Sequence, residues 1–240
     1  MVRYLSLLLF FPVSPPGITG VQNVVMRLEA RYRSARTLQT AFLERYMENG
    51  RVVRVEAGTA YFRRPGKMRW DYQSPEKNVF LVDGKTAWFY VPADHTATRV
   101  PAKESADWRT PLALLVGDMK ISRVCEHVLA AIDEKPENPE NAMLYCQLRG
   151  AASKSAKKPS RASSSQKPSD SESVFFEIDP NSGDLVRVLI RDPGGIEITF
   201  SFANWRMDPP VSDSLFRFDA PKGVAIVNGE LPARNTGINP

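Results

Sequence analysis

The stretch Arg63–Val91 constrains the fold most, because it combines three strand-like runs with two turn signals. Apolar and charged residues alternate across Lys67–Tyr72, so a strand here places large apolar groups on one face. These groups are Met68, Trp70 and Tyr72. The apolar run Val79–Val82 then ends at Asp83-Gly84, a dipeptide that tolerates positive φ at both centres of a two-residue hairpin turn. The stretch therefore predicts consecutive antiparallel strands.

The last run of this stretch, Thr86–Val91, is apolar on both faces. Trp88 and Tyr90 fall on one face of the predicted strand, and Ala87, Phe89 and Val91 fall on the other. Such a strand is either buried on both sides, or it faces a core on one side and an apolar ligand on the other. The sequence leaves both interpretations open.

The segments that precede this stretch predict a helix and a hairpin. Apolar residues recur at helical spacing through residues 20–35, which indicates one amphipathic helix. Leu38–Glu48 and Arg51–Phe62 flank Asn49-Gly50, which predicts a hairpin with a type I′ turn.

A short and very apolar segment interrupts the strands. Thr110 can cap a helix whose first turn contains a proline, and the predicted helix then carries four large aliphatic residues. Its members are Pro111, Leu112, Leu114, Leu115 and Val116. Such a helix must cover an opening or pack on the sheet. Further on, Ile121–Ile132 fits either a strand or a helix, and the spacing of its apolar residues favours the helix.

The rest of the chain continues as strands, Ala142–Leu148, Val174–Asp179, Leu185–Arg191 and Ile196–Phe202, with turn residues between the last three. The total of nine or ten antiparallel strands predicts a mainly β (α+β) fold, a strongly curved sheet or incomplete barrel with an N-terminal amphipathic helix. The apolar surplus then has two interpretations: a filled core, or a hydrophobic cavity that the helix at 110–116 closes as a lid.

Composition indicates one folded domain with flexible additions. At 240 residues with 42% hydrophobic residues the chain suits a single domain, which we expect at 21–224. Residues 151–173 are rich in Ser, Lys and Pro and predict a disordered insertion. The segment 149–173 accounts for +4 of the net charge of +5, so the folded body is nearly neutral. Residues 1–20 resemble a secretory signal, and 225–240 predict a loose tail.

The residues that could perform chemistry form no catalytic or metal-binding pattern. His95 and His127 have no partner at ligand spacing, and no nucleotide-binding fingerprint occurs. Cys125 and Cys146 would form a disulfide in an exported protein, and two buried thiols are the alternative. We therefore expect no enzyme, cofactor or metal, and no binding of nucleic acid by the folded body.

A set of residues in and after this stretch resembles the outer-membrane lipoprotein carrier protein family (LolA). The matching residues are Arg64-Pro65, Arg69-Trp70, Pro75, Val82-Asp83-Gly84-Lys85, Trp88, Tyr90, Pro92, Thr110-Pro111, Phe216, Phe218, Pro221, Gly223 and Val224. Ala41-Phe42 also fits upstream. The resemblance covers about residues 20–120 well and 174–224 loosely.

The resemblance implies a monomeric periplasmic carrier with no enzymatic activity. Such carriers take acylated lipoproteins from an inner-membrane lipoprotein-releasing ABC transporter and deliver them to an outer-membrane receptor. It further implies that Arg64 holds the lid closed and that the strand aromatics line a cavity for acyl chains. The candidate lining is Met68, Trp70, Tyr72, Phe80, Trp88, Tyr90, Phe200 and Phe202. The alternative is an envelope lipid-binding or sensing module of the same fold.

Overall fold

The computed structural model describes residues 16–103, 110–149 and 172–229. Most of the predicted leader, the predicted insertion and the end of the predicted tail lie outside these residues. The described part of the chain is mainly β, with a single α-helix, α1 (Pro16–Arg33), and several short 3-10 helices.

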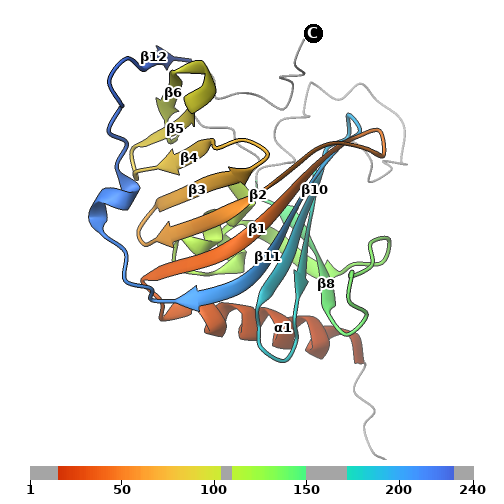
Figure 1. The fold of residues 1–240 in the computed structure, drawn as a ribbon. Coiled ribbons are helices and arrows are strands. Elements are labelled where there is room, and N and C mark those ends of the chain that lie inside the picture. The colour runs from red at the N-terminus through yellow and green to blue at the C-terminus, as the bar shows by residue number, and fades with distance from the viewer. Residues whose placement is uncertain (1–15, 104–109, 150–171, 230–240) are drawn as a thin grey trace, which may run out of the picture.

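Twelve strands in the described residues form one long, curved and open sheet (Figure 1). In chain order they are β1 (Thr37–Glu48), β2 (Arg51–Arg63), β3 (Lys67–Ser74), β4 (Val79–Val82), β5 (Thr86–Val91), β6 (Thr96–Pro101), β7 (Cys125–Ala130), β8 (Ala142–Leu148), β9 (Ser173–Ile178), β10 (Leu185–Arg191), β11 (Ile196–Met207) and β12 (Ala225–Asn228). Their order across the sheet is β12-β6-β5-β4-β3-β2-β1-β11-β10-β9-β8-β7. The predicted fold class is confirmed, and the sheet is not closed.

The hairpin predicted at Asn49-Gly50 is confirmed, since both residues have positive φ, 50° and 77°. The turn predicted at Asp83-Gly84 is displaced by one residue. The backbone N–H of Asp83 donates to the carbonyl of Thr86, so the turn centres are Gly84 and Lys85. Only Gly84 has positive φ, and the carboxylate of Asp83 instead accepts hydrogen bonds from the N–H groups of Lys85 and Thr86.

Two other sequence predictions are wrong. The segment Ile121–Ile132 forms a short 3-10 helix, η3 (Ile121–Arg123), followed by strand β7, because pairing with β8 outweighs the helical spacing of its apolar residues. The expected loose tail is ordered at Ala225–Asn228, where β12 pairs in parallel with β6. This pairing is long-range and has no strong local signal.

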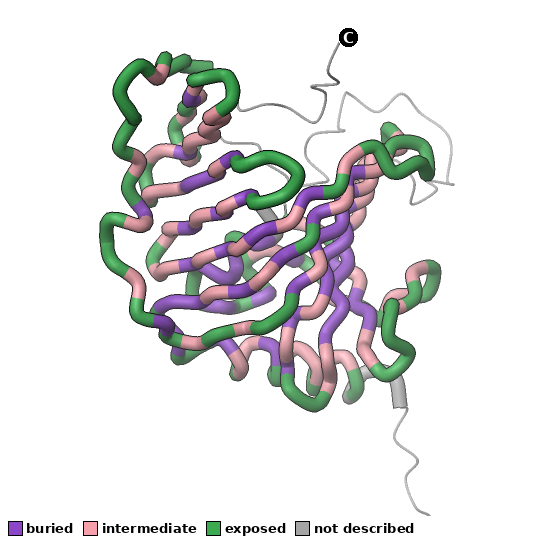
Figure 2. Tube along the Cα trace, viewed as in Figure 1, coloured by how far each residue is buried: buried purple, intermediate pink, exposed green. Residues whose placement is uncertain are grey.

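The sheet has an inner face, which carries the main core, and an outer face. Register places Phe62, Met68 and Val82 on the inner face together, and the same face continues through Phe42 and Phe202. The helix α1 lies along the lower end of the curved sheet (Figure 1) and inserts Leu28 and Tyr32 into this core, both with 0% exposure. Figure 2 shows the resulting buried band through the middle of the sheet.

The helix α1 is fixed to the strands by polar contacts at its C-terminal end. The hydroxyl of Tyr32 accepts a hydrogen bond of 2.8 Å from the N–H of Leu185, and Arg31 forms an ion pair of 2.6 Å with Asp184. Burial raises the pKa of Tyr32 far above its ordinary value, which keeps the hydroxyl neutral.

The two cysteines form a disulfide, with Cα atoms 5.3 Å apart. The bond links the start of β7 to β8, and both residues are buried, at 1% and 0% exposure. The structure thus decides between the two alternatives that the sequence left open.

Candidate functional site

Arg64 connects the apolar lid segment to the end of α1. The lid contains the 3-10 helix η2 (Thr110–Leu115), and the Nε of Arg64 donates a hydrogen bond of 3.2 Å to the carbonyl of Leu115. Its Nη1 donates to the carbonyls of Arg33 and Ala35, at 2.8 and 2.9 Å. One guanidinium therefore binds the last residues of both segments, as its fixed fork of donors allows.

The charge of Arg64 suits these carbonyl groups. Carbonyls at the C-terminal end of a helix carry partial negative charge and attract a cation. Partial burial lowers the pKa of Arg64 below its ordinary value, and the neighbouring Asp118 and Asp208 act in the opposite direction. An arginine with a lowered pKa still remains protonated at neutral pH.

A second contact from the same turn also reaches the lid. The backbone N–H of Gly66 donates a hydrogen bond of 3.0 Å to the carbonyl of Val116. Gly66 has φ of 69°, a conformation that glycine adopts without strain. The sequence analysis missed this residue, although Pro65-Gly66 is itself a turn signal.

The aliphatic residues of the lid point into the core of the protein. Leu112, Leu114, Leu115 and Val116 are 0–6% exposed and belong to the same buried cluster as the inner face of the sheet. The side chain of Pro111 lies outside the described residues. The lid thus occupies part of the interior that the sheet encloses.

Six of the eight predicted lining residues come together on the inner face. Met68, Trp70, Tyr72, Phe80, Phe200 and Phe202 are 0–7% exposed and belong to this cluster. Trp70 is central, with ring centroids 5.3 Å from Phe200 and 6.2 Å from Phe202.

The other two predicted lining residues, Trp88 and Tyr90, lie on the outer face. In the β4–β5 pairing, Phe80 lies opposite Phe89, and both point inward. Trp88 lies opposite Leu81, and because neighbouring residues of a strand point to opposite faces, this pair points outward. Both aromatic rings pack on Phe218, with centroids 4.8 Å and 5.5 Å apart, instead of on Trp70. The structure does not bring them to the predicted interior.

Several further aromatic residues of this interior were not predicted as lining, and three of them contact the predicted set. Phe42 and Phe62 contact Trp70 edge to face, at 4.8 and 5.7 Å, and Trp205 packs on Phe202 at 5.4 Å. The alternation of Leu38–Glu48 carries a signal for Phe42. No local pattern identifies Trp205, which follows the predicted end of its strand.

Two acidic residues, Glu44 and Glu56, lie on the inner face of the sheet. Glu44 is 1% exposed and accepts a hydrogen bond of 2.7 Å from the hydroxyl of Tyr72. Glu56 stands directly opposite Glu44 in the β1–β2 pair and forms an ion pair with Arg54 at 2.9 Å. The interior therefore has a polar part beside its aromatic part.

A third buried carboxylate, Glu177, binds the loop 131–141 to the outer face. It is 0% exposed and forms an ion pair of 2.7 Å with Arg187. Burial alone would raise the pKa of Glu177, but hydrogen bonds from Asn141, from the backbone of Glu137 and Asn138, and from Arg187 outweigh it and lower that pKa. The loop covers a small apolar group on the outer face, made of Met143, Phe175 and Leu189.

A surface pocket of about 370 Å³ lies apart from this interior, between the β1–β2 and β10–β11 turns. Its lining mixes apolar residues such as Met47 and Ile196 with the charged residues Arg191, Asp192 and Glu197. Arg191 is already paired with Glu134 and Glu197, at 3.0 and 2.8 Å. This pocket is therefore lined in part by charges, unlike the buried aromatic interior.

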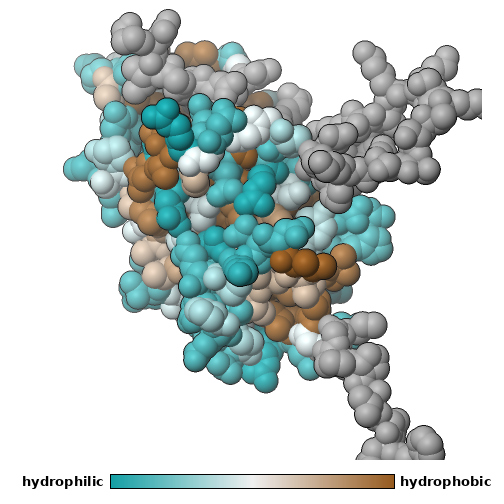
Figure 3. Space-filling view, turned by 90° about the vertical axis from the view of Figure 1, so that its right-hand side faces the viewer, coloured by the Kyte–Doolittle hydropathy of each residue, from teal (hydrophilic) through white to brown (hydrophobic). Residues whose placement is uncertain are grey.

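The surface itself carries scattered hydrophobic residues. On the face shown in Figure 3 they form separate patches among hydrophilic residues. Within residues 16–103, 110–149 and 172–229, no group of three or more His, Cys, Asp or Glu residues is placed to hold a metal ion. No helix of these segments has the length and apolarity to cross a membrane.

A family model and curated relatives indicate the same family. Residues 33–136 match the family model described as outer membrane lipoprotein carrier protein LolA. An outer-membrane lipoprotein carrier protein from Nitrosomonas europaea is 27% identical over 215 residues, 85% of this chain and 89% of that protein. One from Methylococcus capsulatus is 29% identical over 210 residues, 83% of this chain and 85% of that protein.

Solved structures show more distant likeness. A LolA superfamily protein from Nitrosomonas europaea has a TM-score of 0.42 at 9% identity and covers 82% of this chain and 97% of its own. An uncharacterized conserved protein from Thermus thermophilus has a TM-score of 0.48 at 12% identity, with 87% and 98% covered. These TM-scores are low. The fold assignment therefore rests on the strand order of this chain and not on likeness to those structures. Residues 33–136 therefore match the outer-membrane lipoprotein carrier family, and the resemblance of this chain to that family is confirmed.

Proposed function

We propose that this protein is a periplasmic carrier that shields the acyl chains of lipoproteins and moves them from the inner to the outer membrane. The observation that carries the proposal is the lid, whose aliphatic residues fill the interior and whose end is held by Arg64. Release of this end would expose the aromatic inner face to an acyl chain. The family resemblance supplies lipoprotein as the cargo.

The energetics favour such an arrangement. Each methylene group transferred from water to an apolar interior gains about 0.8 kcal/mol, so bare acyl chains do not leave a membrane readily. A carrier must cover them and still release them. Lid residues that substitute for the chains in the empty protein would keep the inner face covered in both states.

The contacts of Arg64 suit a latch that can open. They go to backbone carbonyls, which water can solvate once the lid moves away, so no buried charge is left without a partner. A lysine offers a single charged nitrogen and cannot reach three carbonyls with the same geometry.

The disulfide supports the proposed location. Structural disulfides persist in oxidising compartments such as the bacterial periplasm and are rare in the cytosol. In this scheme an inner-membrane lipoprotein-releasing ABC transporter supplies the cargo, and an outer-membrane receptor or the outer membrane accepts it.

Uptake of a triacylated lipopeptide and of a fluorescent acyl probe by the purified protein tests the proposal. We expect saturable uptake by the wild type, and slower release by Arg64→Leu, because the lid no longer closes readily over the empty interior. Arg69→Leu is the matched control. Arg69 lies in β3 shortly after the same turn, but it binds Asp71 and the carbonyl of Leu215 and not the lid. Absence of uptake in the wild type would contradict the carrier function, and unchanged release in Arg64→Leu would contradict the latch.

A further inference from the structure

The lid and the segment that follows it are each held by their own group of contacts. The boundary between the two groups lies at Gly117-Asp118. Upstream, the lid end is held at the carbonyls of Leu115 and Val116 by hydrogen bonds from Arg64 and Gly66. Gly117 and Asp118 are exposed. Downstream, Met119–Cys125 is held by a different set of elements, and we call this segment the post.

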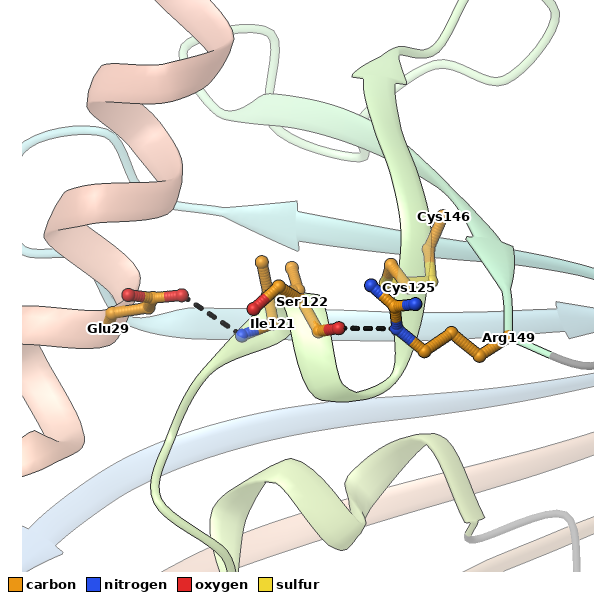
Figure 4. The surroundings of a disulfide bond; sticks show 6 residues. All are labelled: Glu29, Ile121, Ser122, Cys125, Cys146 and Arg149. Carbon is orange, nitrogen blue, oxygen red and sulfur yellow. Dashed lines mark hydrogen bonds between the residues drawn. A yellow bond between two sulfur atoms is a disulfide. The ribbon is translucent and has the colours of Figure 1, made fainter.

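Three contacts from two segments, α1 and the end of β8, bind the post (Figure 4). Glu29 on α1 accepts a hydrogen bond of 3.0 Å from the N–H of Ile121. Arg149, just after β8, donates through its Nε to the carbonyl of Ser122 at 2.6 Å. The disulfide then joins Cys125 covalently to Cys146 in β8.

Three side chains of the post are also buried. Met119, Ile121 and Cys125 are 1–4% exposed and belong to the main core cluster. The backbone of the post is also held at the end of β8. The N–H of Arg149, the residue after β8, donates a hydrogen bond of 2.9 Å to the carbonyl of Val124. The lid end and the post thus differ in kind: the described contacts of the lid end are all non-covalent, and those of the post include a covalent bond.

The covalent bond lies at one edge of the sheet. The strand β7 is an edge strand whose sheet partner is β8, and its register shifts between Cys125 and His127. Edge strands with interrupted pairing are among the first elements to open locally. A lid that moved would pull on this end of β7, and the disulfide opposes that pull.

We propose that the Cys125–Cys146 disulfide makes the post a fixed pivot, so that the lid opens by rotation at Gly117-Asp118 without loosening β7. The inference rests on the proposed function only in that the lid is the part that moves. The disulfide confines the opening to residues upstream of Met119. Without it, lid release would spread through the post into the edge of the sheet.

Residue-resolved amide hydrogen exchange on the cargo-free protein tests this inference. The N–H of Gly66 reports on the lid end, because it binds Val116, and the N–H groups of Ile121 and Arg149 report on the post. In the oxidised wild type we expect Gly66 to exchange at least ~10-fold faster than the two post amides. In Cys125→Ala/Cys146→Ala we expect the three rates to converge.

Two controls isolate the disulfide. Leu189→Ala removes a buried side chain outside the main core cluster with the disulfide intact, and should preserve the difference in rates. Arg149→Ala removes one non-covalent anchor of the post, and Ile121 should stay slow because the disulfide remains. The Arg149→Ala variant tests whether the disulfide keeps the post fixed even if the double cysteine variant does not fold.

Equal rates in the wild type, a persisting difference in the double cysteine variant, or fast exchange of Ile121 in Arg149→Ala would each overturn the inference. The exchange measurement needs no cargo. If the rates behave as expected but the acyl probe is not taken up, the carrier function fails while the pivot stands.

Discussion

The inner and outer faces of strands β4 and β5 are both apolar and both covered, but the two covers are attached in different ways. The inner face is covered by the lid, whose end is held at Leu115 and Val116 from one turn. The outer face is covered by the C-terminal segment 208–228, which is attached along its length. Among the described residues, the hydrogen bonds that Arg64 and Gly66 donate to the lid gather at its end, whereas the contacts of the C-terminal segment are distributed along it.

The anchors of the outer cover are spread over several strands. Asp208 accepts a hydrogen bond of 2.7 Å from the N–H of Arg36, and Arg63 donates to the carbonyl of Val211 at 2.6 Å. Phe218 stacks on Trp88 further along, and β12 then pairs with β6. A strand that is apolar on both faces therefore has two covers, and the proposed function makes the lid the one that is released.

The largest expected effect concerns the buried ion pair between Arg187 and Glu177. This pair lies under the loop 131–141, which is a second cover of the outer face. Arg187→Met leaves the carboxylate of Glu177 buried without its cation, and we expect a loss of ~3–5 kcal/mol in the free energy of unfolding. Urea denaturation at neutral pH measures it. Arg191→Met, which removes a half-exposed arginine that pairs with Glu134 and Glu197, should cost no more than ~1 kcal/mol. Equal losses would show that this cover is not held by its buried pair.

A matched pair of leucines compares the two covers directly. Leu81 on the outer face and Leu115 in the lid are both 0% exposed. Leu81→Ala should destabilise the protein by ~2–5 kcal/mol, as expected for a core leucine. Leu115→Ala should cost less, because its effect on global stability cannot exceed the free energy of opening the lid. Urea unfolding of both variants gives the comparison, and a larger loss for Leu115→Ala would contradict a releasable lid.

The pH dependence of stability gives a smaller effect. The pKa of Glu177 is lower in the folded protein than in the unfolded chain, so its stabilisation is complete above the unfolded pKa and is lost as the pH falls through the folded pKa. Wild-type stability should therefore fall on acidification below about pH 4.5. Glu177→Gln should show a shallower fall, and identical slopes in urea titrations from pH 6 to pH 3 would disprove the assignment.

The ring stack between Phe218 and Trp88 gives the smallest expected change. Phe218→Leu keeps an apolar side chain but removes the aromatic pair, which contributes roughly 0.5–1.5 kcal/mol. We expect a loss of that size in thermal or urea unfolding, and no change in acyl-probe uptake, because the stack lies on the outer face. Impaired uptake would place Trp88 in the interior after all.

Local signals predicted most of the elements and part of the site. The helix at α1, the Asn49-Gly50 turn, the apolar lid and the alternating strands follow from periodicity and turn chemistry, which depend on neighbouring residues. The position of Arg64 was predicted from the family resemblance, and the structure shows its contacts with the lid. Its effect on lid opening stays a prediction.

The sequence by itself determined that Thr86–Val91 is apolar on both faces, and only the tertiary structure decided what covers each face. Alternation separates Trp88 and Tyr90 from Phe89, but it does not say which set points inward. That choice depends on register with β4 and on Phe218, which is distant in the chain. The same holds for β7, the β12–β6 pair and the disulfide, because each is made by contacts between segments that local patterns cannot pair.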